Sequence, residues 1–340
     1  MTKPRTHLLI NYPKFPASLK RGLAERGIVL IENDWQPEAG LLQRTLACVV
    51  DFGGSIKHPL RALAWKRHLS RRGVPVFAWN RDAPHNNNIR PWRLALFDRL
   101  RPLDLYATHS LIDARWSFAD TVLYLPNAAD TAAYNLRGEP EAVLARLRDP
   151  GQYRWDVSFF GALDGDRYKE AEGRKAFFGA LATRLDALGI RHRFVDTTHT
   201  SMSLEEQVGL IQCSRINLNF GARCDYGGFS ASGLPDRCFG IPACGGFLLT
   251  DRRTHTADSF EIGRHLDEFA DLDECITKIR HALGNFSLSR STAEAGWRHV
   301  MRCHTYAGRA ETMHKALLDW HAGRRGLICN PVQSCRNATT

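Results

Sequence analysis

Short apolar segments alternate with helix-like segments along the whole chain, and this alternation limits the possible folds more than any other feature. The strand-like segments of the first half are residues 7–11, 28–32, 46–52, 74–79, 103–108 and 121–125. They are rich in Val, Ile, Leu and aromatic residues, which is typical of strands buried on both faces of a parallel sheet. Helix-like segments lie between them at 17–26, 57–72, 92–100 and 110–116. The pattern predicts an α/β fold with helices on both faces of the sheet.

The same alternation starts again after Pro150-Gly151. Strand-like segments follow at 156–163, 191–196, 216–220 and 245–250, and helix-like ones at 169–188, 203–213, 234–243, 272–283, 290–302 and 308–321. We therefore predict two Rossmann-like parallel-sheet domains, 1–150 and 151–322, that face each other across a cleft. The last helix, 308–321, can pack back on the first domain, and 323–340 reads as a flexible tail. Ligands of such sheets bind beyond the carboxyl ends of the strands, so we expect the site in the cleft.

Charge is concentrated in the first half of the chain. The net charge is +10, and residues 1–150 carry 22 basic and 14 acidic side chains, a net +8. A basic half indicates an anionic neighbour, such as a membrane surface, a phosphate-bearing substrate or nucleic acid, although many soluble proteins are simply basic. No apolar run approaches the roughly 20 residues that span a bilayer. We expect a cytoplasmic protein, either free or peripheral at the inner face of the cell membrane.

The segment 216–251 carries the strongest functional signal. Its loop 227–233 (GGFSASG) leads directly into the helix 234–243, whose first N–H groups and dipole favour an anion. Small residues let a phosphate approach the backbone, and the Arg237 guanidinium can hold a diphosphate through paired hydrogen bonds. We predict a phosphate site at Ser230, Ser232, Gly233 and Arg237. A flexible surface loop with a solvated arginine is the alternative.

Residues 237–251 (RCFGIPACGGFLLTD) resemble the signature of the CgeB-like (spore-maturation type) glycosyltransferases, which belong to the glycosyl transferases group 1 superfamily. The family pattern is approximately R-x-F-E-[IV]-x-A-C-G-G-F-L-L-T-D. Further segments that resemble the family are 122–130 (VLYLPNAAD), 155–161 (WDVSFFG), 260–274 and 304–309 (HTYAGR). The resemblance covers 156–320 well and the first half only loosely.

The resemblance implies a two-domain GT-B glycosyltransferase of the hexosyltransferase type, with retention of anomeric configuration and a role in surface glycan synthesis. The donor would be a UDP- or GDP-sugar bound by the second domain, and the first domain would bind a carbohydrate, lipid-linked or protein acceptor. It implies that no metal is required. We also expect no other cofactor and no nucleic acid partner. Positive side chains would stabilise the leaving diphosphate instead. The nine cysteines, without a CxxC pair, also give no zinc pattern. The donor-binding residues would be Gly161, Asn219, Ser230, Ser232, Gly233, Arg237, Gly240 and Asp251.

Two positions depart from the family pattern. Gly240 stands where the family has the acidic residue after R-x-F, and His265 stands where it often has an acid. A glycine cannot hold the ribose hydroxyls, so ribose recognition uses other residues, the donor is unusual, or activity is lost. The alternative function is therefore a non-catalytic GT-B-fold protein that binds an anionic partner, either nucleic acid or a membrane surface.

The first domain offers polar residues after its fourth strand. Asp82 and His85 follow the strand 74–79, and either could polarise an acceptor hydroxyl. Together with Arg237 they are the predicted catalytic residues, although Asp82 can instead form an Asx turn before Pro84. His109 and Asp51 follow other strands and are weaker candidates, with capping or turn roles as alternatives. His304 is expected to be a packed residue.

Overall fold

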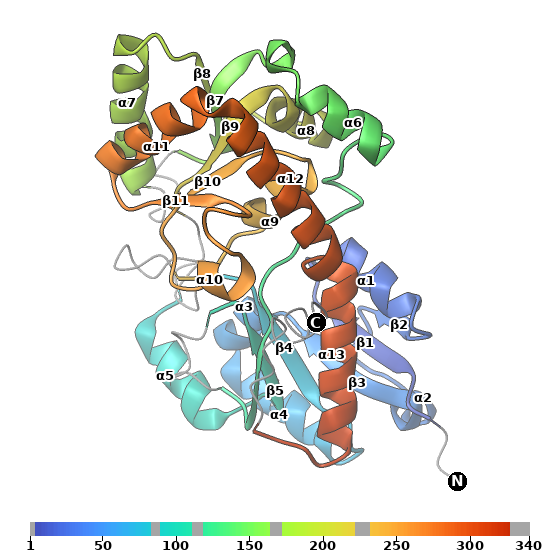
Figure 1. Ribbon diagram of the computed structural model, residues 1–340. Helices are drawn as coiled ribbons and strands as arrows, with labels where there is room; N and C mark the ends of the chain where they lie inside the picture. Colours follow the sequence, from blue (N-terminus) through green and yellow to red (C-terminus); the bar gives the residue numbers. More distant parts are fainter. Residues whose placement is uncertain (1–3, 83–88, 111–117, 164–171, 222–231, 327–340) are drawn as a thin grey trace. The chain divides into compact units, whose positions relative to one another are not determined.

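The computed structural model (Figure 1) describes residues 4–82, 89–110, 118–163, 172–221 and 232–326. The chain divides into two compact units, one of Met1–Pro126 with Tyr306–Thr340 and one of Asn127–Thr305. Each unit contains one sheet in which every strand pairing is parallel. The prediction of an α/β fold with two parallel-sheet domains is confirmed.

The first unit is built on a sheet with strand order β2-β1-β3-β4-β5-β6. Its elements are β1 (His7–Asn11), α1 (Ala17–Ala24), β2 (Val29–Glu32), α2 (Ala39–Arg44), β3 (Thr45–Val50), α3 (Phe52–Lys57), α4 (Pro59–Ser70), β4 (Val76–Asn80), α5 (Pro91–Leu100), β5 (Leu105–Thr108), β6 (Thr121–Tyr124) and α13 (Tyr306–His321). In the register of the central strands, Ile10 of β1 lies opposite Val49 of β3. All residues of β1, β3, β4 and β5 are buried, which explains their continuous apolar sequences.

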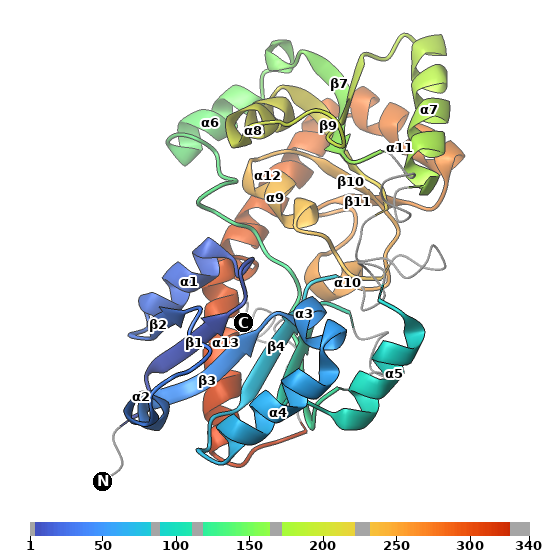
Figure 2. The ribbon, with the colours of Figure 1, turned by 180° about the vertical axis from the view of Figure 1, so that it is seen from behind.

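Helix α13 belongs to the first unit although it comes last in the sequence (Figures 1 and 2). It packs closely against α1. A Cβ atom placed on Gly22 of α1 would lie only 3.0 Å from the Ala307 Cα and 3.0 Å from the Ala310 Cβ of α13. Small residues on both helices therefore let the two backbones approach each other, and Gly22 has no room for a larger side chain.

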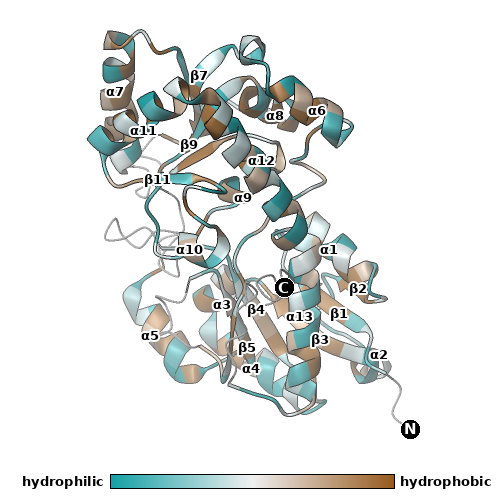
Figure 3. Cartoon of the chain, viewed as in Figure 1, coloured by the Kyte–Doolittle hydropathy of each residue, from teal (hydrophilic) through white to brown (hydrophobic). Residues whose placement is uncertain are grey.

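The second unit has a sheet with strand order β11-β10-β9-β7-β8. Its elements are α6 (Pro140–Leu147), a 3-10 turn (Pro150–Gln152), β7 (Trp155–Gly161), α7 (Glu172–Ala187), β8 (His192–Asp196), α8 (Leu204–Gln212), β9 (Ser214–Asn219), α9 (Arg237–Ala243), β10 (Leu248–Asp251), α10 (Thr256–Ser259), β11 (Asp267–Phe269), α11 (Leu272–Gly284) and α12 (Phe286–Cys303). Successive residues of β10 enter different cores, since Leu248 belongs to the cluster that contains Phe239 and Leu249 to the cluster that contains Phe159. Apolar residues gather on strands such as β9 (Figure 3).

The domain boundary differs from the predicted one at residue 150. Residues 127–150 belong to the second unit. The Asn127 Nδ2 donates a hydrogen bond to the Leu234 backbone oxygen at 3.0 Å. Helix α6 packs through Leu144 and Leu147 on a cluster that includes Tyr153. These apolar contacts, rather than the Pro150-Gly151 punctuation, decide where the chain passes from one unit to the other. The predicted tail lies outside the described residues from 327 onward.

Several elements differ from the sequence prediction. The helix expected at 57–72 is two helices, α3 and α4, which meet at His58 with φ −130° and ψ 62°. Pro59 follows, and a residue before proline is displaced from the helical conformation. The helix expected at 110–116 lies largely outside the described residues. The short elements α2, α6, α10 and β11 were not predicted, because each spans too few residues to show a clear periodicity.

Candidate functional site

Three neighbouring strands of the second unit end in residues that the sequence assigns to donor binding. Gly161 ends β7, Asn219 ends β9 and Asp251 ends β10. The fully buried Asn219 amide donates to the Asp251 Oδ1 at 3.0 Å and to the Thr250 Oγ1 at 3.0 Å. The Arg237 Nη1 lies 3.4 Å from the Asn219 Oδ1, to which it donates. The structure thus brings Gly161, Asn219, Arg237 and Asp251 together at the carboxyl edge of this sheet.

The Arg237 guanidinium lies against the end of β7. Its Cζ is 4.8 Å from the centre of the Phe159 ring and 5.4 Å from that of Phe160. A Cβ on Gly161 would be 2.7 Å from one guanidinium nitrogen of Arg237. Gly161 therefore provides the space in which the guanidinium sits, and two aromatic rings support it by cation–π contact.

No carboxylate within the described ranges lies at ion-pair distance from Arg237. Its pKa is lowered to about 10, mainly because burial disfavours the charged form and then because Arg174 is close by. A partly buried cation without an anionic partner is unfavourable, and an anion bound beside it would remove that cost. This corner is therefore suited to an anionic ligand.

Arg174, in the first turn of α7, is a second arginine at the same edge that the sequence analysis missed. Its Nε donates to the Phe220 backbone oxygen at 3.0 Å and its Nη1 to the Ala162 backbone oxygen at 3.1 Å. The side chain is buried and bridges the segments that follow β9 and β7. The available signal was a basic residue in the first turn of a helix that follows a strand.

The Asp251 carboxylate anchors the neighbouring backbone. It accepts from the Arg253 Nη2 at 2.8 Å and Nε at 3.0 Å, and from the Gly221 N–H at 2.9 Å. Arg253 also donates to the Gly233 backbone oxygen at 2.9 Å. Ser232 is fully buried, and its hydroxyl has no hydrogen-bond partner among the residues described. Asp251 and Gly233 are thus joined through one buried arginine.

Helix α9 begins at Arg237 rather than at 234, so Ser232 and Gly233 precede a turn and not the helix itself. Within α9, Gly240 is buried against a tyrosine. A Cβ at this position would lie 3.3 Å from the Tyr134 ring, and the Tyr134 hydroxyl donates to the Gln207 side chain. The Tyr134 ring is therefore in close contact with the position that the first side-chain atom of an acidic residue at 240 would take.

The first-unit candidates lie at the ends of its strands. Asp82 is exposed just beyond β4, and its N–H donates to the Asn80 Oδ1 at 3.3 Å. His109 is buried with its Nδ1 3.4 Å from the Asn80 backbone oxygen. Asp51 caps α3 by accepting from the Gly54 N–H. Two predicted site residues, His85 and Ser230, lie outside the described residues.

The two histidines singled out in the sequence, His265 and His304, lie in one cluster of the second unit. The His304 Nε2 is 3.1 Å from the His299 Nε2, and His304 is buried beside Phe239 and Phe260. The His265 ring stacks on His299 with 4.1 Å between ring centres. No group of three or more His, Cys, Asp or Glu side chains within the described ranges is arranged to hold a metal ion. No helix of the described chain is both long and apolar enough to cross a bilayer.

Residues 147–315, just under half of the chain, match the family model described as glycosyl transferase-like. No curated protein matches the chain significantly. Among solved structures, a sucrose-phosphate synthase from Thermosynechococcus elongatus is similar with a TM-score of 0.60 and 13% identity, over 93% of this chain and 99% of that one. The Anabaena protein HepE in complex with UDP is similar with a TM-score of 0.58 and 12% identity, over 92% and 100%.

A UDP-forming trehalose-phosphate synthase from Burkholderia xenovorans is similar with a TM-score of 0.55 and 10% identity, over 93% of this chain and 99% of that one. At these identities the structures define the fold, which is that of the GT-B glycosyltransferases. The family match adds the class of protein. Residues 147–315 therefore form a glycosyl transferase-like region, and the prediction of a glycosyltransferase enzyme on a GT-B fold is confirmed.

Proposed function

We propose that this chain is a metal-independent glycosyltransferase of the CgeB-like type that takes its sugar from a nucleotide diphosphate sugar. Arg237 holds the diphosphate and stabilises the negative charge that develops as the bond to the sugar breaks. Asn219 orients the guanidinium through its Oδ1, and Gly161 leaves it room. Solved structures of the similar Anabaena HepE contain UDP, UDP with glucose, or UDP-glucose, which supports a UDP-type donor.

One observation carries the donor assignment. Arg237 has a lowered pKa and no carboxylate partner in the described part of the chain, at the sheet edge where α/β proteins bind ligands. A structural arginine would normally be paired when it is this strongly desolvated. The glycine, the amide and the aromatic rings that surround it fix its position, so the site is ready for an anion.

Calorimetric titration of the full chain with UDP, GDP and UDP-glucose, with and without EDTA, tests this function. We expect one nucleotide to bind with an affinity that EDTA leaves unchanged. Arg237→Ala should weaken it at least tenfold, since charge-assisted hydrogen bonds contribute about 1.5–3 kcal/mol. Arg280 is an exposed arginine on α11, and Arg280→Ala is the matched control, which should bind the nucleotide as the wild type does. A folded protein that binds none of these nucleotides contradicts the proposal.

The sugar is passed to a carbohydrate, lipid-linked or protein acceptor bound by the first unit, in surface glycan synthesis and with retention of configuration. Asp82 and His85 supply the polar groups that activate the acceptor hydroxyl. Proton NMR of the first product formed reports the anomeric configuration directly. An inverted product removes the retaining mechanism but leaves donor binding intact.

Contact of the basic first unit with the inner face of the cell membrane is also part of this proposal. A surface hollow there is lined by Lys66, Arg67, Arg71 and Arg101 together with Leu63, Ser70 and Leu100. Basic side chains each add about 1 kcal/mol of attraction to an anionic lipid surface. Co-sedimentation with phosphatidylserine vesicles at low salt should be lost in Arg67→Gln/Arg71→Gln. Equal binding to neutral vesicles contradicts a charge-driven contact.

A further inference from the structure

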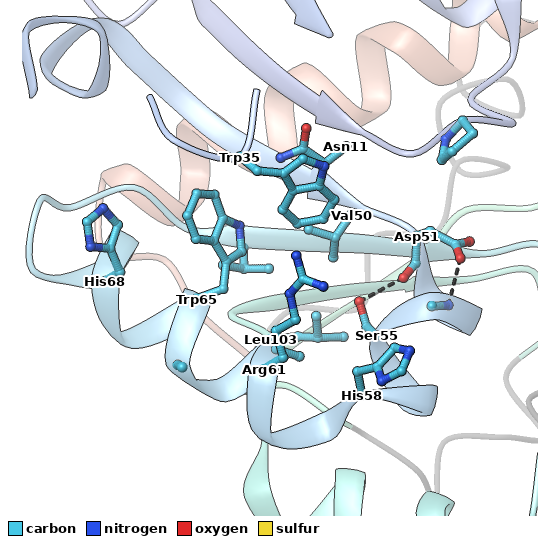
Figure 4. Close-up of a pocket in the computed structure, with 15 residues that line it drawn as sticks. Asn11, Trp35, Val50, Asp51, Ser55, His58, Arg61, Trp65, His68 and Leu103 are labelled. Atoms are coloured by element: carbon cyan, nitrogen blue, oxygen red, sulfur yellow. Dashed lines mark hydrogen bonds between the residues drawn. The ribbon is translucent and has the colours of Figure 1, made fainter. Parts of the chain in front are cut away.

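The first unit contains a cavity of about 650 Å³ that is not part of the proposed donor site (Figure 4). Its walls come from α3, α4, the ends of β1 and β3, and the loop that carries Trp35. Its size falls within the range of roughly 300–1,000 Å³ that is usual for small-ligand pockets. Asn11 is the last residue of β1 and Asp51 directly follows β3, so both mark the carboxyl edge of the sheet. The cavity therefore has the size and the location of a ligand site.

Two tryptophans form the aromatic wall of this cavity. The ring centres of Trp35 and Trp65 are 5.8 Å apart with 52° between their planes, and Trp65 is stacked on His68. Trp35 remains 45% exposed, which is high for so large an apolar side chain. A flat aromatic surface at the mouth of a cavity can pack against the C–H face of a sugar ring.

Polar groups complete the lining. The Arg61 guanidinium lies over Trp35 at 5.7 Å from its ring centre, and Arg61 takes part in no ion pair within the described ranges. The Asp51 carboxylate is held by the Gly54 N–H at 2.6 Å. The Asn11 amide donates to the Asp34 backbone oxygen at 2.9 Å, while its Oδ1 is buried without a hydrogen-bond partner in the part of the chain described.

Figure 4 shows Asp51, Ser55 and His58 at one end of the cavity and Arg61 between that end and the tryptophans. A cation, hydrogen-bond acceptors and an aromatic wall thus converge on one space. The acceptors can hydrogen-bond to sugar hydroxyls, and the aromatic wall can pack against a sugar ring. The Arg61 guanidinium can pair with an acidic substituent on that sugar. A neutral sugar would leave the arginine without a partner, and an acidic group alone would leave the tryptophans unused.

We propose that this cavity binds a sugar that carries an acidic group, either a phosphate or a carboxylate. The sugar ring packs on Trp35 and Trp65, its hydroxyls donate to Asp51, and the acidic group pairs with Arg61. That this sugar is the acceptor of the transfer reaction rests on the proposed function. Binding of the sugar does not, because every residue involved lies in the first unit.

Titration calorimetry of the full chain with four probes tests the proposal: glucose 6-phosphate, glucuronate, glucose and inorganic phosphate. Each titration is run without nucleotide and with saturating UDP, so that an ordered mechanism cannot hide binding. We expect at least one acidic sugar to bind tenfold or more tightly than both glucose and inorganic phosphate. Phosphate and carboxylate are distinguished by which acidic sugar binds more tightly.

The variants Arg61→Gln and Trp35→Leu should each weaken binding of the acidic sugar about tenfold or more and leave UDP binding unchanged. The chain offers a matched control, since Arg93 lies over the exposed Trp92 on α5 at 5.3 Å, outside the cavity. Arg93→Gln and Trp92→Leu should bind like the wild type.

The proposal fails if no acidic sugar binds with or without UDP, if neither acidic sugar binds more tightly than both glucose and inorganic phosphate, or if the cavity variants and the control variants behave alike. The donor assignment stands or falls separately, on UDP binding and its loss in Arg237→Ala.

Discussion

Gly161 and Arg237 share one space: a Cβ on residue 161 would lie 2.7 Å from a guanidinium nitrogen of Arg237. The same Cβ would also lie 2.9 Å from the Phe159 ring, which is buried in the core. The arginine can move aside, whereas the packed ring cannot move easily. The position of the cation at the sheet edge therefore depends on a residue that itself has no functional group.

Replacing Gly161 with alanine should displace the Arg237 guanidinium. We expect nucleotide affinity to fall several-fold and the free energy of unfolding to fall by about 1–3 kcal/mol, as for other overpacked sites. Calorimetry with UDP and urea unfolding measure the two effects. Gly179→Ala on the surface of α7, where a Cβ meets nothing within 4 Å, is the control and should be slightly stabilising. If the affinity for UDP were unchanged in Gly161→Ala, donor binding would not depend on the position of the Arg237 guanidinium.

Introducing the acidic residue of the family pattern, Gly240→Glu, should destabilise the second unit. The Cβ alone would lie 3.3 Å from the Tyr134 ring, and the added carboxylate would start from a buried position of α9. We expect a loss of at least about 1–3 kcal/mol in urea unfolding. The double variant Gly240→Glu/Tyr134→Ala should recover part of the loss if the clash is the cause. A fully stable single variant would show that Tyr134 does not fill this space.

Breaking the buried pair of Arg253 and Asp251 should cost far more stability than breaking a surface pair. The Arg253 side chain is inaccessible to solvent, and Arg253→Met leaves the Asp251 carboxylate buried without this partner. We expect a loss of about 3–5 kcal/mol. Arg264→Met removes the ion pair between Arg264 and Glu261, whose side chains are 67% and 60% exposed, respectively. This variant should lower the free energy of unfolding by less than about 1 kcal/mol. If Arg253→Met and Arg264→Met lost similar amounts of free energy in urea unfolding, the buried pair would not be the more important of the two for stability.

Acid should destabilise the second unit through its histidine cluster. Burial, followed by the neighbouring His299, lowers the pKa of His265 to about 4, below the value of about 6.5 in an unfolded chain. As the pH falls from about 6.5 to about 4, the unfolded chain takes up this proton first, so stability present above pH 6.5 is lost.

Thermal unfolding between pH 7.5 and 4 measures this loss. His265→Gln removes the titrating group and should flatten the profile between pH 6.5 and 4, whereas His281→Gln, in α11, should leave it steep. Profiles that are equally steep in the wild type and His265→Gln would assign the acid sensitivity to other groups.

The fold was largely predictable because buried parallel strands have a distinctive sequence. The prediction for β1 at 7–11 matches the observed His7–Asn11, and that for β8 at 191–196 differs from His192–Asp196 by one residue. Prediction failed where tertiary contacts decide the outcome. Nothing local in 127–150 shows that Asn127 bonds to Leu234, so the domain boundary was placed too late.

The candidate site was only partly predictable. The location of Asn219 and Asp251 at strand ends follows from the order of the elements. Arg174 was missed because its importance comes from backbone oxygens of Ala162 and Phe220, which are distant in the sequence. The cavity beside Trp35 was also not predictable, because its walls come from segments that only the sheet brings together.

The return of α13 to the first unit has a consequence for how the chain is made. Synthesis completes residues 127–305 while the surface of α1 around Gly22 still lacks Ala307 and Ala310. The unit that emerges first from the ribosome is thus the last to be finished, and a chain interrupted after residue 305 would have a complete second unit and an incomplete first one.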